Sequence, residues 1–125
     1  MSKNIKIVFT GDLLLADREH SMGVGIGTKI ALKQKLWRNN LKEIFLNADL
    51  SVMNLEGPII GTNIIRTLSP WEGNPGIVDL LRSSKINVLN LANNHILEHG
   101  AKGYRDTISI IEESGINIIG STQNS

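Results

Sequence analysis

The chain has 125 residues and a mass of 13.7 kDa, which predicts a single domain (1–125) large enough to bury a core. Thirteen lysines and arginines against 12 aspartates and glutamates leave a formal charge of +1, which argues against nucleic acid or an anionic membrane as a partner held by bulk charge. The absence of cysteine excludes a disulfide scaffold, a thiolate metal site and a cysteine nucleophile.

The first part of the chain predicts two strands separated by a loop and a helix. Residues 1–6 contain neither a signal-peptide core nor a cleavage site, and no apolar run reaches the roughly 18 residues of a membrane span, so we expect a cytoplasmic chain without a membrane segment. Residues 5–9 are rich in isoleucine and valine and predict a buried strand. Residues 16–28 contain three glycines of a Gly-x-Gly-x-Gly run and predict a mobile loop. Residues 33–47 carry apolar side chains at helical spacing, and 50–55 predict a second strand.

The second part of the chain continues the alternation after an irregular stretch. An Asn-Pro pair is typical of a helix start and predicts a short helix over 75–84. A third strand is expected at 86–91 and a fourth at 116–119. Between them, 101–114 predict a helix that ends at Gly115 as a left-handed C-cap.

Strands that alternate with helices predict an α/β fold with a mainly parallel sheet. In an open sheet of this kind, ligands bind beyond the carboxyl ends of the strands. Residues that follow the predicted strands are therefore the first candidates for a functional site.

Three successive predicted strands end in polar residues beside glycine. Asp12 follows the first strand, Glu56 follows the second, and Asn94 follows the third. Carboxylate, amide and imidazole groups are suitable ligands for Mg, Mn, Fe or Zn. We predict that Asp12, Glu56 and Asn94 approach one another at the carboxyl edge of the sheet.

His95 is the candidate catalytic side chain of this edge. It is adjacent to Asn94, so one of the two can bind a metal while the other faces the substrate. Histidine exchanges protons near neutral pH and is suited to act as a general acid beside a metal-bound phosphate. Either Glu98 or His99 can orient its ring.

Each of these features also has a purely structural interpretation. A Gly-Asp pair after a strand is often a turn, and a lone histidine is often structural. Asn54 and Asn90 lie inside predicted strands, where a buried amide can simply tie loops together by hydrogen bonds. The hypothesis of a site therefore depends on the coincidence of three strand ends.

Two other features receive structural interpretations. The Gly-x-Gly-x-Gly run at 23–27 does not directly follow a strand and lacks the spacing of a nucleotide-binding loop, so we interpret it as flexible. We assign Trp71 to packing and Arg66 to solvent.

Several strings in the sequence carry a resemblance to a known family. They are Gly11-Asp12, Asn54-Leu55-Glu56-Gly57-Pro58 and Leu91-Ala92-Asn93-Asn94-His95, followed by Gly100, Gly103 and Asp106-Thr107. Over essentially its whole length, the chain resembles the CapA family of bacterial poly-γ-glutamate capsule biosynthesis proteins, which are related to the calcineurin-like metallophosphoesterases.

The resemblance implies a fold and a set of site residues. The fold would be half of the metallophosphoesterase-type α/β/β/α sandwich. Asp12 matches the first metal-ligand position, Glu56 the bridging carboxylate and Asn94 the amide ligand. His95 matches the catalytic histidine, and Glu98 stands where the family usually has aspartate, one methylene shorter.

The family domain extends well beyond the length of this chain, and its later part brings further histidine ligands. We therefore expect a truncated N-terminal part of a larger domain, with an incomplete divalent metal site. The missing C-terminal half, or self-association through exposed sheet surface, would complete it. The resemblance is also compatible with a membrane-associated complex.

The activity that the resemblance implies is metal-assisted hydrolysis or transfer at a phosphoester or related bond. The substrate would be an anionic small molecule or polymer of capsule or poly-γ-glutamate biosynthesis. Two alternatives stay open. One is a non-catalytic interaction or scaffold domain that has lost the metals, and the other is a Rossmann-like binder of a small ligand.

Overall fold

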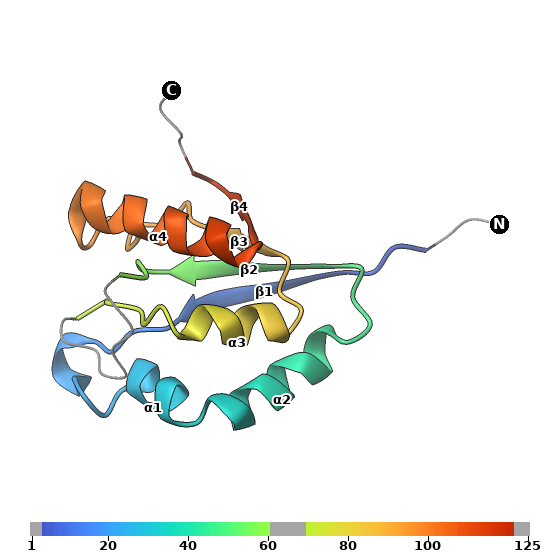
Figure 1. Ribbon diagram of the computed structural model, residues 1–125, viewed down its shortest axis with the longest axis horizontal. Coiled ribbons are helices and arrows are strands. Elements are labelled where there is room, and N and C mark those ends of the chain that lie inside the picture. Colours follow the sequence, from blue (N-terminus) through green and yellow to red (C-terminus); the bar gives the residue numbers. More distant parts are fainter. Residues whose placement is uncertain (1–3, 61–69, 122–125) are drawn as a thin grey trace.

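The computed structural model describes residues 4–60 and 70–121, in which strands alternate with helices (Figure 1). The strands are β1 (Ile7–Leu14), β2 (Leu50–Glu56), β3 (Val88–Asn90) and β4 (Asn117–Ile119). The helices are α1 (Ile26–Leu32), α2 (Gln34–Phe45), α3 (Ile77–Ser83) and α4 (Gly100–Ser114), and a 3₁₀ turn, η1, spans Glu19–Ser21.

The strands form one parallel sheet in the order β1-β2-β3-β4. Right-handed crossovers in this order place the connecting helices on the same face of the sheet. The prediction of an α/β fold with a mainly parallel sheet is confirmed. Within the part of the chain that the structure describes, the strand order never reverses, so this sheet lacks the switch point at which a Rossmann-type sheet binds its ligand.

The face of the sheet that packs against the helices forms the core. Met53, Leu55 and Leu89 point to this face and are buried. They belong to one cluster with Phe45 from α2, Leu80 and Leu81 from α3, and Ile111 from α4. Burying a side chain of this size contributes about 1.5–3 kcal/mol, so this layer supplies most of the favourable free energy of folding.

The described helices leave the opposite face of the sheet open. Ile7 and Phe9 of β1 and Ile119 of β4 lie on it and are 48%, 73% and 48% exposed. Val52 and Val88 lie between them in register and are not part of the helix-side core cluster. Val52 and Val88 are themselves buried, so we call the three exposed side chains, Ile7, Phe9 and Ile119, the open apolar face. The expected apolar sheet surface is therefore present, and the identity of what covers it stays a prediction.

A bulge in β1 directly precedes its polar segment. Phe9 pairs with Val52 and Asp12 pairs with Asn54, so β1 uses one more residue than β2 over this interval. Side chains alternate between faces, but the bulge absorbs the extra residue, so Asp12 lies on the same open face as Phe9 although it is three positions further along. The prediction of a buried strand that ends at residue 9 is wrong on both points, since the strand continues through Asp12 to Leu14 and Ile7 and Phe9 are exposed on its open face.

The segment 16–28 is not a loop throughout, and that prediction is also wrong. It contains η1 and the first residues of α1. The cause is buried Asp17, whose carboxylate accepts hydrogen bonds from the Gly23 N–H (2.8 Å), the Thr28 N–H (3.0 Å) and the Thr28 hydroxyl (2.6 Å). These bonds bring the glycine-rich stretch and the start of α1 together around one side chain.

The remaining predicted elements agree with the structure within a few residues at their ends. Gly115 has a φ of 80° and caps α4 in the left-handed conformation, as predicted. Arg66, which we assigned to solvent, lies outside the described residues. Among the residues that the structure describes, none of the helices has the length and apolar character of a membrane span.

Candidate functional site

A hydrogen-bonded row of polar side chains crosses the open face near the carboxyl ends of the first three strands. Asp12, Asn54 and Asn90 are in register on β1, β2 and β3. The Asn90 amide donates to Oδ1 of Asn54 (2.8 Å), and the Asn54 amide donates to Oδ1 of Asp12 (2.7 Å). We call these three residues the polar row. Its bonds all run toward the Asp12 carboxylate and fix one of its oxygens.

The second group of site residues surrounds His95 in the loop after β3. The Nδ1 atom of His95 lies 2.8 Å from Oε1 of Glu98, and its Nε2 atom lies 3.8 Å from Oε1 of Glu56. The Glu56 and His95 side chains are 16% and 22% exposed, and Glu98 is 38% exposed. An ionised carboxylate only accepts hydrogen bonds, so the contact with Glu98 places a proton on Nδ1 and turns Nε2 toward Glu56.

Glu98, and not His99, contacts His95. The His99 ring instead contacts the backbone at Pro70, with its Nε2 atom 2.8 Å from the Pro70 carbonyl oxygen. The additional methylene of glutamate does not prevent contact with the imidazole, because the distance is that of a direct hydrogen bond. Of the two orienting residues considered from the sequence, the geometry favours Glu98.

Asn93 connects the His95 loop to β2. Its amide donates to the carbonyl oxygen of Leu55 (2.8 Å), and its side-chain oxygen accepts the backbone N–H of His95 (3.0 Å). Asn94, the predicted amide ligand, is exposed in the same loop. The structure therefore brings Glu56, His95 and Glu98 together and connects Asp12 to the polar row, while Asn94 belongs to neither hydrogen-bonded group.

Trp71 is a site residue that the sequence analysis missed. Its ring stacks on His95, with centroids 3.8 Å apart and planes 9° from parallel. The Arg18 guanidinium carbon lies 5.1 Å from the centroid of the same indole, and the indole N–H donates to Oε1 of Glu19 (3.0 Å). Hydrogen bonds from its own backbone and from the indole lower the pKa of Glu19. No local pattern predicts this stack, because its members come from three separate segments.

The glycine-rich stretch before α1 is not a phosphate-binding loop. The Asp17 carboxylate already accepts from the backbone at the start of α1. Burial raises the pKa of Asp17, but hydrogen bonds from Thr28, Gly23 and Gly25 outweigh burial and hold the pKa below its usual value. A side chain at Gly25 would collide with this carboxylate. An anionic ligand would have to displace a negative charge that the fold itself supplies.

The residue types at the carboxyl edge fit a hard divalent cation, since carboxylate and amide oxygens are the donors it prefers. Over residues 4–60 and 70–121, no three His, Cys, Asp or Glu side chains gather into a group that could hold a metal. Asp12 and Glu56 occupy the open face of adjacent strands, two positions apart in the register. Among the described residues, this edge therefore presents two carboxylates, and they are not gathered with a third such side chain.

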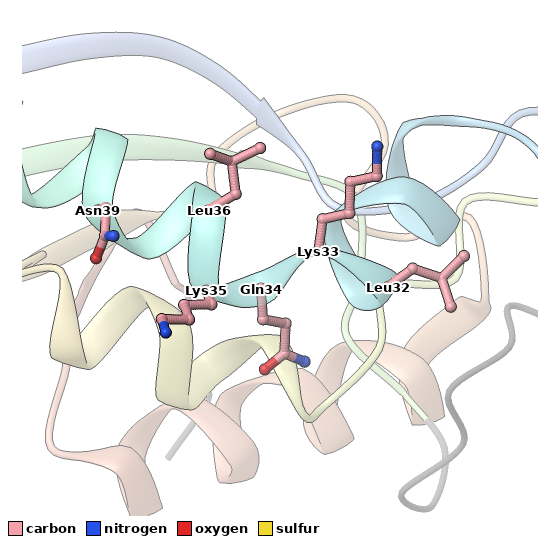
Figure 2. Close-up of a pocket in the computed structure, with 6 residues that line it drawn as sticks. All are labelled: Leu32, Lys33, Gln34, Lys35, Leu36 and Asn39. Carbon is pink, nitrogen blue, oxygen red and sulfur yellow. The ribbon is translucent and has the colours of Figure 1, made fainter.

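A separate open hollow of about 450 Å³ lies at the junction of α1 and α2 (Figure 2). The residues that line it are Leu32, Lys33, Gln34, Lys35, Leu36 and Asn39. None of them is a predicted site residue, and none is a carboxylate. The candidate site is therefore the carboxyl edge of the sheet and not this hollow.

Comparison with known proteins identifies the family. The family model described as bacterial capsule synthesis protein PGA_cap matches residues 6–125. A segment of 47 residues is 40% identical to the capsule biosynthesis protein CapA of Bacillus anthracis, and covers 38% of this chain. This match spans only 11% of the length of that relative. The resemblance noted from the sequence is confirmed, and the chain belongs to the PGA_cap family of bacterial capsule synthesis proteins.

Proposed function

We propose that this chain carries part of a metal-assisted hydrolytic or transfer site that acts on an anionic substrate of capsule biosynthesis. The bond would be a phosphoester or a related bond, and the substrate would be a small molecule or a polymer such as poly-γ-glutamate. The observation that carries the proposal is the position of His95, whose two ring nitrogens face Glu98 at 2.8 Å and Glu56 at 3.8 Å. A histidine between two carboxylates at a strand edge is suited to proton transfer.

His95 would act as the general acid. Glu98 accepts the Nδ1–H and orients the ring, which leaves Nε2 as the atom that gives its proton to the leaving group. Glu56 lies on the Nε2 side, with its Oε1 atom 3.8 Å from that nitrogen. In this arrangement Glu98 is a positioning residue and Nε2 is the reacting atom.

Asp12, Glu56 and Asn94 would hold a divalent cation such as Mn, Mg, Fe or Zn. When bound, such an ion would polarise the reacting centre and favour ionisation of water. The polar row supports this role, because the Asn54 amide occupies Oδ1 of Asp12 and fixes the orientation of the carboxylate. Further ligands would come from outside this chain.

The open apolar face supports a partner for this chain. Phe9 is 73% exposed in the same strand that carries Asp12. We propose that the rest of a longer protein, or a second copy of this chain, covers this face and contributes the remaining ligands. The same surface also favours the alternative of a non-catalytic interaction domain, which would bind a partner without a metal.

Calorimetry with Mn²⁺ tests the proposal. We expect weak binding to the native chain, because few ligands offset the dehydration of the ion, and a further loss in Asp12→Asn. Asp79→Asn is the matched control, because Asp79 lies on α3 and its side chain is 78% exposed. Tight binding that survives Asp12→Asn would mean that the ligands lie elsewhere.

Hydrolysis of bis(p-nitrophenyl) phosphate by the full-length protein tests the catalytic role. We expect His95→Ala to lower kcat while Mn²⁺ binding is retained. A native protein that neither binds Mn²⁺ nor hydrolyses the ester would favour the interaction domain over the enzyme.

A further inference from the structure

Trp71 adopts a backbone conformation that an L-residue seldom takes. Its φ is 62°, in the left-handed region, where the Cβ of an L-residue crowds the backbone. Two hydrogen bonds hold it there: its backbone N–H donates to the carbonyl oxygen of Asp17 (2.9 Å), and its indole N–H donates to Glu19 (3.0 Å). Strained residues held by several independent contacts are concentrated at functional sites.

The strained conformation places the indole against both loops that carry site residues. Gly57, which follows Glu56, has a φ of 102°, and a Cβ built there would lie 3.8 Å from the Trp71 ring. On the side of β3, the indole is stacked on His95, with ring centroids 3.8 Å apart. Trp71 thus lies between the end of β2 and the loop after β3.

The stack restrains the His95 ring in a way that Glu98 alone does not. A single hydrogen bond at Nδ1 leaves the imidazole free to tilt about that bond. A parallel aromatic neighbour removes this freedom, because tilting would lose contact across the whole ring face. The stacked indole thus restrains the plane of the His95 ring, and the contact with Glu98 sets the direction of Nε2 within that plane.

We propose that Trp71 is a positioning residue, which holds the His95 imidazole in the plane that directs Nε2 to the reacting centre. Arg18 and Glu19 support it, since the guanidinium lies over the indole and the carboxylate accepts its N–H. This inference rests on the proposed function of His95. It adds a residue that lies far from His95 in the sequence and outside every motif noted there.

Two substitutions separate stacking from the indole hydrogen bond. Trp71→Phe keeps an aromatic face and loses the bond to Glu19, while Trp71→Leu loses both. The control is Trp37→Leu, because Trp37 packs against the core from α2. The first measurement is the NMR shift of the His95 ring protons, assigned by comparison with His95→Gln. We expect an upfield shift in the native protein and in Trp71→Phe, and its loss in Trp71→Leu.

The second measurement is hydrolysis of bis(p-nitrophenyl) phosphate by the Mn²⁺-loaded full-length protein. Misplacing a catalytic group by about 1 Å costs on the order of 100-fold in rate. We therefore expect Trp71→Leu to lower kcat by up to about 100-fold, with little change in KM. Trp71→Phe should restore most of the rate, and Trp37→Leu should leave kcat unchanged at temperatures where it is folded.

The outcomes distinguish failure of this inference from failure of the proposed function. The inference is overturned if Trp71→Leu keeps the His95 shift, or keeps the native kcat. It is also overturned if Trp71→Phe behaves like Trp71→Leu. A native protein without hydrolytic activity would refute the proposed function, while the His95 shift would still decide whether Trp71 sets the ring plane.

Discussion

Replacement of Asp17 by asparagine tests whether one buried carboxylate organises the segment between β1 and α2. Asp17 is buried, and its two oxygens accept hydrogen bonds that include those from the Gly23 N–H, the Thr28 N–H and the Thr28 hydroxyl. An asparagine keeps one acceptor and presents an NH₂ group in place of the other. The hydroxyl can turn to accept from that NH₂, but the Gly23 N–H cannot.

The expected cost follows from the donor that is left without a partner. A buried donor that loses its acceptor costs about 1–3 kcal/mol, and hydrogen bonds to a charged group are the stronger ones, so we expect the free energy of unfolding to fall by about 2 kcal/mol. With a urea m-value near 2 kcal/mol/M, the midpoint of unfolding should fall by about 1 M. Circular dichroism and tryptophan fluorescence in urea measure this shift.

The same carboxylate predicts the direction of the pH dependence. Its pKa in the folded protein lies below the usual value, so the folded state favours the ionised form. The stabilisation is complete above the unfolded pKa of about 4 and is lost as the pH falls through the lower folded pKa. The difference in stability between the native protein and Asp17→Asn should therefore shrink below about pH 4.

Asp79→Asn is the matched control, because it makes the same chemical change on the surface. Asp79 is 78% exposed and forms an ion pair with Arg82 at 3.4 Å. Exposed pairs contribute about 0–1 kcal/mol, so this variant should unfold within about 0.5 kcal/mol of the native protein. If Asp17→Asn and Asp79→Asn unfold at the same urea concentration, the Asp17 carboxylate does not organise this segment and the reasoning fails.

Three further predictions concern Gly57, Phe9 and Gly120. Gly57→Ala should lower the free energy of unfolding by about 1–2 kcal/mol, because Gly57 has a φ of 102°. Gly11→Ala should lower it little, because a methyl group there meets open space. Equal losses in the two variants would contradict this prediction. Phe9→Ser should reduce self-association in sedimentation with little loss of stability, and a native chain that is monomeric at every concentration would refute it. In Gly120→Ala a methyl group would collide with the Asn90 amide, so the Asn90 side-chain NMR signals should move, and unchanged signals would count against the polar row.

The order of strands and helices was predictable because hydrophobic periodicity is a local property. The segments at 50–55 and 101–114 agree with β2 and α4 within one residue at each end. The bulge in β1 was not predictable, because it is defined by pairing with β2. Its location explains why the sequence analysis placed Asp12 after a strand and the structure places it inside one.

The candidate site was predictable only in part, for a related reason. Glu56 is the last residue of β2, and His95 and Glu98 lie in the loop after β3, so topology brings them to one edge. Trp71 was assigned to packing, because nothing near it in the sequence indicates a partner in the His95 loop. Asp17 did leave a signal in the sequence, namely the glycines that follow it. A glycine-rich stretch can indicate close packing of the backbone around a buried carboxylate instead of flexibility, and Gly25 is such a case.

The bulge also constrains how this strand tolerates insertion and deletion. Removing one residue at Thr10 or Gly11 would restore an even count between Phe9 and Asp12. The hydrogen-bonded ladder would then run from Phe9 to the carboxylate without a bulge, and the carboxylate would stay on the open side, opposite Asn54. A single-codon deletion at this point would thus remove the bulge and preserve the chemical character of both sides of the strand. Relatives that keep a carboxylate on this strand can therefore have either spacing, with or without the extra residue.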